Sequence, residues 1–141
     1  DEVIYIERVT PNRMMRVEQV IGSRAPLHVT AVGKLMLGDL GDAFIRAYAK
    51  RTCLKRYTLH THTTQMNLLK DVHESSAQGY ALDNEEAETG VGCIGALIRE
   101  SGGKVAAGLS ISAPIERRKT EWAVLLQESA RIISERMGYN E

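Results

Sequence analysis

Two apolar segments on either side of a glycine turn constrain the fold of this chain more than any other feature. Residues 91–98 read VGCIGALI and residues 104–112 read KVAAGLSIS, with Ser101, Gly102 and Gly103 between them. Short runs rich in apolar and β-branched residues are typical of strands, and a tight glycine turn joins strands that run antiparallel. The sequence therefore predicts a central antiparallel hairpin.

Helices and further strands are predicted around this hairpin. Strands are expected at 3–9 and 14–21, paired through a turn at Pro11 and Asn12, and a short extended piece is expected at 80–83. The polar stretch 55–64 is expected to be irregular. Helical spacing covers 31–37, 42–51, 66–76 and 122–137, with Thr30 as an N-cap and Gly38, Gly79 and Gly138 as C-terminal stops. This order predicts an α+β fold in which helices pack on an antiparallel sheet.

Composition excludes several classes of function for this segment. The chain has 141 residues, 18 basic and 18 acidic, which favours one domain without the clustered positive charge of a nucleic-acid surface. No apolar run approaches the roughly 20 residues that span a bilayer, so no membrane partner is expected. Cys53 and Cys93 lie far apart, which favours free thiols in a reducing, cytoplasmic setting. No nucleotide-binding or phosphate-loop motif is present, and no cofactor is expected.

The return strand of the hairpin has one face made of small and hydroxyl-bearing residues. Alternation along the strand puts Gly108, Ser110 and Ser112 on that face, and the same alternation puts Cys93 and Gly95 together on the partner strand. Small side chains leave volume for a ligand, or they make room for a packed helix. The pattern supports the two interpretations about equally.

Two neighbouring segments offer polar groups. Asp83 adjoins the short strand and opens the acidic turn 83–86, so it is the member of that turn best placed to point inward, although a solvated turn is the commoner arrangement. Thr30, Ala31 and Val32 form a predicted helix start, whose free N–H groups and dipole favour a carboxylate. A plain capped helix explains the same pattern.

Metal and nucleophile chemistry receive little support. His60 and His62 have metal-ligand spacing, but no cysteine or carboxylate is spaced to complete a site. Cys93 has no base beside it in sequence, and neither Ser110 nor Ser112 lies in a nucleophile elbow. We therefore expect no metal and no catalytic residue.

Four motifs in order resemble a known family. They are PLHVTAVGK at 26–34, GYALDNEE at 79–86, GVGCIGALI at 90–98 and GLSISAP at 108–114. Together they are similar to the effector-binding domain of IclR-type bacterial transcription regulators, along nearly the whole chain. The sequence departs from the usual family pattern at Gly95, Leu97 and Ala113, which would alter the shape of a pocket rather than the fold.

The resemblance implies a GAF-like antiparallel sheet flanked by helices, with residues 1–141 as the effector domain. It also implies a winged helix-turn-helix domain upstream of Asp1, absent from this chain, through which alone the protein would bind DNA. Matching motifs residue by residue gives the ligand-binding positions Ala31, Val32, Asp83, Cys93, Ser110 and Ser112. The implied partners are a small carboxylate or sugar-acid effector and further copies in a homodimer or homotetramer, and the implied role is regulation of transcription, not catalysis.

The chemistry of these positions suggests how an acid would lie. Its carboxylate would accept hydrogen bonds from the amides of Ala31 and Val32 and from the hydroxyls of Ser110 and Ser112. Asp83 would repel that carboxylate, so it should accept from hydroxyls at the other end of a hydroxy, keto or sugar acid. Two alternatives stay open: a GAF-like enzyme that uses Cys93, and a pure oligomerisation module.

Overall fold

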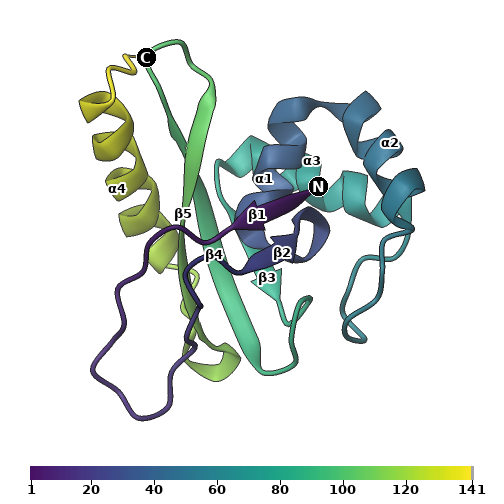
Figure 1. Ribbon diagram of the computed structural model, residues 1–141, viewed down its shortest axis with the longest axis horizontal. Coiled ribbons are helices and arrows are strands. Elements are labelled where there is room, and N and C mark those ends of the chain that lie inside the picture. Colours follow the sequence, from purple (N-terminus) through teal and green to yellow (C-terminus); the bar gives the residue numbers. More distant parts are fainter. Residues whose placement is uncertain (141) are drawn as a thin grey trace.

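The computed structural model describes residues 1–140 and contains two antiparallel sheets and four α-helices (Figure 1). The larger sheet has the order β3–β4–β5, and the smaller one pairs β1 with β2. In chain order the elements are β1 (Glu2–Ile4), β2 (Arg24–Pro26), a 3-10 turn (Leu27–Val29), α1 (Ala31–Leu40), α2 (Asp42–Thr52), α3 (Gln65–Gln78), β3 (Ala81–Asn84), β4 (Val91–Arg99), β5 (Val105–Pro114), a second 3-10 turn (Ile115–Arg117) and α4 (Trp122–Arg136). The α+β class is as predicted.

The predicted hairpin is the long centre of the structure. β4 pairs antiparallel with β5, and the register sets Cys93 opposite Ser112 and Gly95 opposite Ser110. β3 adds on the other edge of β4 and sets Asp83 opposite Cys93. Because residues directly opposite each other point to the same side of a sheet, all of these side chains share one face.

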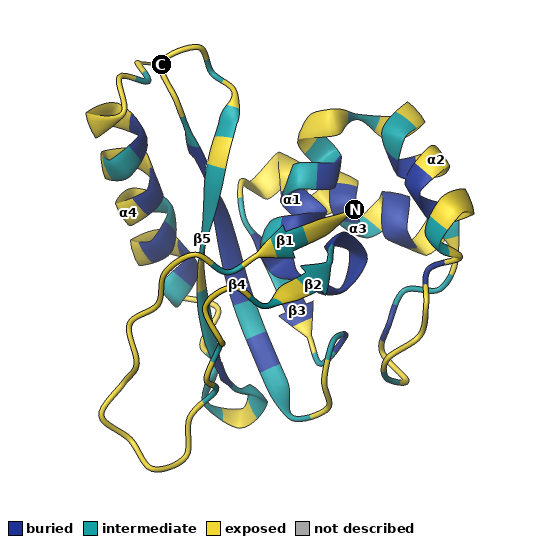
Figure 2. Cartoon of the chain, in the orientation of Figure 1, coloured by how far each residue is buried: buried dark blue, intermediate teal, exposed yellow. Residues whose placement is uncertain are grey.

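Helices cover both faces of the β3–β4–β5 sheet. α4 packs on one face, where Ile94, Ala96 and Ile98 meet the apolar stripe of the helix. α1 lies on the other face, and α2 and α3 stand behind it around a second core that includes Leu37, Tyr48 and Leu68 (Figures 1 and 2). The sheet face that carries Cys93 and Ser112 is therefore the one that receives the N-terminus of α1.

The predicted first hairpin is wrong in its extent. β1 stops at Ile4, residues 14–21 form no strand, and β1 pairs instead with β2. Residues 6–21 form a long loop in which Val9, Met14 and Val20 are exposed (Figure 2). A strand is stabilised by burying one of its faces, and these side chains have no core to enter.

The predicted helix start at Thr30 is confirmed, but its stop at Gly38 is wrong. α1 continues to Leu40, and Gly38 packs so close to Ser76 of α3 that a side chain there would overlap the Ser76 hydroxyl. Gly79 ends α3 in the left-handed conformation as predicted.

Both cysteines are free, and no helix among residues 1–140 combines the length and the apolar character that crossing a membrane requires.

Candidate functional site

The six predicted ligand-binding residues lie together around the start of α1. Asp83 of β3, Cys93 of β4, and Ser110 and Ser112 of β5 share one sheet face. Ala31, from the first turn of α1, belongs to the same apolar cluster as Cys93, and Val32 packs over Gly95 and Gly108. Ala31 and Asp83 are buried, Val32, Cys93 and Ser112 are half-buried, and Ser110 is exposed.

The N-terminus of α1 presents free amides to this face. The Thr30 hydroxyl accepts a hydrogen bond from the N–H of Gly33 at 3.2 Å, as an N-cap should. The N–H groups of Ala31 and Val32 appear in no hydrogen bond between residues 1–140. They belong to the set of helix amides that have no partner within the helix, which favours an anion.

Gly95 and Gly108 allow α1 to lie close to the sheet. A Cβ on Gly95 would lie 2.8 Å from the backbone nitrogen of Val32, and one on Gly108 would overlap the Val32 side chain. At these two positions the small residues make room for a packed helix, which was one of the two interpretations of the pattern. The ligand interpretation is left with Cys93, Ser110 and Ser112, of which Cys93 packs in the same cluster as Ala31.

Asp83 is a buried carboxyl, only 2% exposed. Its Oδ1 accepts a hydrogen bond from the backbone N–H of Glu86 at 2.8 Å. Burial, and then the nearby charge of Glu86, raise the pKa of Asp83 to about 6. Asp83 therefore points inward as expected, and at neutral pH it holds a charge in a place that disfavours one.

Cys93 is held as a neutral thiol. Its Sγ lies 3.1 Å from the Ser112 hydroxyl. Burial and the charge of Asp83 raise the pKa of Cys93 to about 12. Thiolate is the reactive form of cysteine, so this environment argues against the alternative of an enzyme that uses Cys93.

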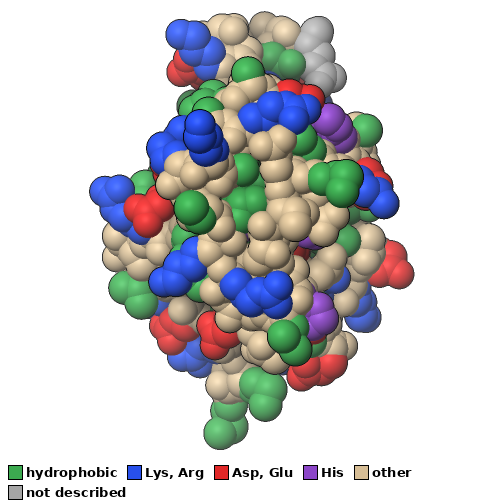
Figure 3. All heavy atoms as spheres, turned by 90° about the vertical axis from the view of Figure 1, so that its right-hand side faces the viewer, with side chains coloured by type: hydrophobic (Ala, Val, Ile, Leu, Met, Phe, Trp, Pro, Cys, Tyr) green, Lys and Arg blue, Asp and Glu red, His purple; other side chains and the backbone are tan. Residues whose placement is uncertain are grey.

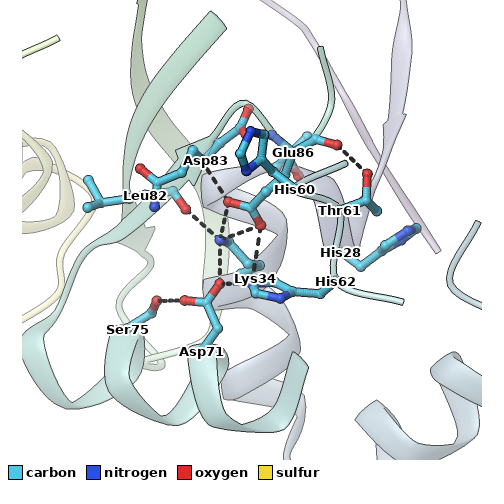
Figure 4. A network of polar contacts seen from close by, with 12 residues as sticks. His28, Lys34, His60, Thr61, His62, Asp71, Ser75, Leu82, Asp83 and Glu86 are labelled. Carbon is cyan, nitrogen blue, oxygen red and sulfur yellow. Dashed lines mark hydrogen bonds and ion pairs between the residues drawn. The ribbon is translucent and has the colours of Figure 1, made fainter. Parts of the chain in front are cut away.

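A buried ion network, which was not predicted from the sequence, lies behind the site (Figure 4). Lys34 of α1 is fully buried, and its ammonium donates to Asp71 at 2.7 Å and to Glu86 at 2.9 and 3.0 Å. It also donates to the backbone oxygen of Leu82 in β3. The ammonium thus ties α1 to β3, to the acidic turn and to α3.

His62 joins the same network but makes a poor metal site. Its Nε2 lies 2.7 Å from Asp71 and 3.5 Å from Glu86, and these three residues could supply ligands to a metal. The Lys34 ammonium already holds the same two carboxylates. Burial alone would raise the pKa of Asp71, but the hydrogen bond from His62 and the charge of Lys34 outweigh it and lower the pKa to about 2. His60, whose spacing from His62 is that of metal ligands, is not in this group.

Two further residues adjoin the site. Arg118 donates from Nη1 to the backbone oxygen of Asp83 at 2.7 Å and lies against Gly92. Tyr5, just after β1, is half-buried, and burial raises its pKa to about 12, to which Cys93 and Asp83 also contribute. No motif marked either residue. Tyr5 falls within a segment predicted as an ordinary strand, and Arg118 lies between elements.

Two hollows of the surface lie away from the six predicted residues. One of about 360 Å³ adjoins His28 and Tyr57, and one of about 510 Å³ lies between α1, β4 and α4. Neither includes any of the six predicted residues. On the face formed by α2 and α3, basic and acidic side chains are interspersed (Figure 3), so that face offers no basic patch to an acid.

Comparisons with known proteins agree on one family. Residues 1–135 match the family model described as "Bacterial transcriptional regulator IclR C-terminal". The chain is 37% identical to the HTH-type transcriptional regulator KdgR of Dickeya chrysanthemi over 145 aligned positions, which cover all of this chain and 48% of that protein. The chain thus spans about half the length of this curated relative, which is a regulator rather than an enzyme.

Solved structures give the same result. The Thermotoga maritima IclR structure matches with a TM-score of 0.88 at 32% identity, over 98% of this chain and 57% of that one. The inducer-binding domain of the PobR transcription factor from Acinetobacter, solved with 3-hydroxybenzoic acid, matches with a TM-score of 0.75 at 26% identity, over 91% and 73% of the two chains.

Proposed function

Because this chain belongs to the IclR family of bacterial transcriptional regulators and matches the C-terminal part of that family, we propose that it senses a small organic acid for such a regulator. The acid binds where the start of α1 meets the β3–β4–β5 sheet. Binding changes the oligomeric or DNA-binding state of the whole protein, which contacts DNA through a separate N-terminal domain and works in the cytoplasm.

One observation supports this proposal: the amides of Ala31 and Val32 make no hydrogen bond within residues 1–140, and the α1 start lies against the sheet face that carries hydroxyl and carboxyl groups. The amides of Ala31 and Val32 suit the carboxylate of the ligand. Ser110 and Ser112 add hydroxyl donors on the same sheet face. No basic side chain is needed, which agrees with the neutral composition of the chain.

The charge of Asp83 indicates which end of the ligand lies near it. A carboxylate next to Asp83 would be repelled, so the acid end lies at the helix and the other end approaches Asp83. This arrangement suits a hydroxy, keto or sugar acid better than a purely aliphatic one. A ligand of about ten heavy atoms binds with micromolar to millimolar affinity.

Calorimetry and thermal shift would test the proposal directly. The panel is lactate, pyruvate, 2-oxoglutarate, gluconate and 3-hydroxybenzoate, with propionate and benzoate as acids that lack the extra oxygen. At least one oxygenated acid should raise the melting temperature, and Ser110→Ala should weaken its binding without unfolding the domain. Ser129→Ala, on the exposed side of α4, is the matched control and should change nothing. No stabilisation by any acid would refute the proposal.

A part in assembly is favoured by a different observation. The loop 6–21 exposes Ile6, Val9, Met14, Met15 and Val20, and apolar side chains exposed together mark interaction surfaces. We propose that a second copy of the chain covers this loop in a homodimer or homotetramer. Sedimentation of the wild type against a Val9→Ser, Met14→Ser double variant tests this, and equal masses at all concentrations would exclude it.

A further inference from the structure

The larger of the two hollows, of about 510 Å³, lies at the edge of β4 between α1 and α4. Its volume falls in the range of roughly 300–1,000 Å³ that small-molecule sites occupy. Its apolar part includes Leu35, Ala96 and Ala130, each of which is no more than 4% exposed. None of the six residues of the proposed effector site lines this hollow, so a ligand here would occupy a second site.

The strand β4 has an open edge in this hollow, at Leu97. The β3–β4 register ends where Ala81 lies opposite Gly95. Gly79 would come opposite Leu97 if β3 were longer, but it ends α3 in the left-handed conformation and donates its N–H to the Ser75 oxygen. Leu97 therefore has no strand partner on the β3 side.

The backbone groups of Leu97 point to this open edge. In an antiparallel sheet, the backbone groups of alternate residues of a strand point to the same edge. The Val91 oxygen accepts from the N–H of Glu85 on the β3 side, and the Arg99 N–H leaves the hairpin to donate to the Ser134 hydroxyl at 2.9 Å. Leu97 has the same parity, so its N–H and oxygen point away from β5, and among residues 1–140 no hydrogen bond from outside the sheet reaches them.

An ion pair with spare capacity stands beside the open edge. Arg99, two residues along β4, places its Nη2 2.7 Å from Oδ1 of Asp39 near the end of α1, and its Nη1 donates to the Gly103 oxygen at 2.8 Å. Among residues 1–140 no further residue bonds to the Asp39 carboxylate, and Arg99 Nε makes no hydrogen bond. The two side chains are 30% and 32% exposed, and both line the hollow.

The charges that line the hollow come in opposite pairs. Asp39 lies beside Arg99, and Arg131 of α4 is paired with Glu128 and Glu135. A simple acid at the ion pair would be attracted by Arg99 and repelled by Asp39, and a simple amine would meet the reverse. A zwitterion can place each of its charges beside the opposite one, so the pair suits a zwitterion best.

We propose that this hollow is a second ligand site, for a free α-amino acid with an apolar side chain. The ammonium donates to Asp39 and to the Leu97 oxygen, and the carboxylate accepts from Arg99 and from the Leu97 N–H. The amino acid thus pairs with β4 as one residue of an added strand would. Its side chain lies on the apolar part of the hollow. The second site does not depend on the proposed effector site.

Calorimetry with leucine and two matched analogues tests this site. The ligands are L-leucine, 4-methylpentanoate, which is leucine without its amino group, and 3-methylbutylamine, which is leucine without its carboxylate. Asp39→Asn removes one charge of the ion pair, and Gln127→Trp fills the hollow from α4 without changing its charge. Asp42→Asn is the matched control, because Asp42 pairs with His73 outside the hollow.

Leucine should bind the wild type, and each analogue should bind at least about 10-fold more weakly because it lacks one charged group. Asp39→Asn should weaken leucine binding by about 10- to 100-fold, the usual effect of one hydrogen bond to a charged group. Gln127→Trp should abolish binding, and Asp42→Asn and Ser110→Ala should leave it unchanged. Melting temperatures recorded in parallel show that each variant is folded.

Three results would overturn the second site and leave the proposed effector site standing. They are no binding of leucine to the wild type, an analogue that binds as tightly as leucine, and leucine binding that Gln127→Trp leaves intact. If Asp39→Asn fails to fold, Gln127→Trp decides the question. Loss of leucine binding in Ser110→Ala with none in Gln127→Trp would place the amino acid at the start of α1 instead.

Discussion

Replacing Asp83 by asparagine should stabilise the folded domain at neutral and higher pH. Burial raises the pKa of Asp83 from 3.8 to about 6, so above pH 6 the folded protein holds a charge that the unfolded chain accommodates more easily. Below pH 3.8 the carboxyl is protonated in both states, and the penalty is absent. As pH rises from 3.8 to 6, stability is lost progressively, and above 6 the loss is complete.

The size of the effect follows from the shift. A difference of about two pKa units corresponds to about 3 kcal/mol at pH 8 and to less than about 1 kcal/mol at pH 4. Asparagine keeps an oxygen for the Glu86 N–H but adds an amide that needs its own partner. The net gain at pH 8 should therefore be about 1 to 3 kcal/mol, or several degrees in melting temperature for a domain of this size.

Thermal unfolding of Asp83→Asn and wild type at pH 8 and pH 4 measures this gain. Asp71→Asn is the matched control with the opposite sign, because the pKa of Asp71 is lowered to about 2 and its charge stabilises the fold above pH 3.8. We expect Asp83→Asn to melt higher than wild type at pH 8 and nearly level with it at pH 4, and Asp71→Asn to melt lower at pH 8. An Asp83→Asn variant that melts lower than wild type at pH 8, or by the same margin at both pH values, would refute the reasoning.

Three other changes test the packing and chemistry of the site. Lys34→Met should destabilise the domain by about 3 to 5 kcal/mol in denaturant unfolding, because it leaves the Glu86 carboxylate buried without its cation; a loss below 1 kcal/mol would mean that water replaces the ammonium. Gly108→Val should lower the melting temperature by displacing Val32, whereas Gly102→Ala, in open space, should have little effect, and equal melting of the two would contradict the contact. Alkylation of Cys93 should be slower than that of the exposed Cys53, since burial raises the pKa of Cys93 to about 12; faster reaction at Cys93 would revive the enzyme alternative.

The predicted helices and strands are correct where the local sequence pattern agrees with the burial of the residues. The β4–β5 hairpin is two apolar runs around a glycine turn, and α3 ends at a left-handed Gly79, so both could be placed from their own residues. Residues 14–21 have the β-branched composition of a strand, yet most of their side chains are exposed and they pair with no other strand. Gly38 shows a similar limit: it resembles a helix stop, but its role is to admit Ser76 of a helix more than 30 residues away.

The candidate site likewise contains some residues that could be predicted from the sequence and others that could not. Asp83 and the α1 start could be marked because a strand end and a helix start have recognisable local signals. Lys34 could not, since an isolated lysine in a helix is ordinarily exposed, and only the meeting of α1, α3 and the acidic turn buries it. Tyr5 could not be marked either, because only the fold half-buries a side chain that the pattern assigns to an ordinary strand.

The buried lysine also indicates how ligand binding could reach the rest of the protein. The two ends of the proposed site belong to different elements, the carboxylate end to α1 and the hydroxyl end to β3. Lys34 joins these elements one turn below the free amides, through Glu86 and the Leu82 oxygen, and extends the connection to Asp71 of α3. An acid that draws α1 and β3 together therefore acts on α3 through a rigid ion pair, whereas α4 packs on the opposite face of the sheet. If an effector favours one state of the regulator over another, the difference in contacts should appear first between α1 and α3.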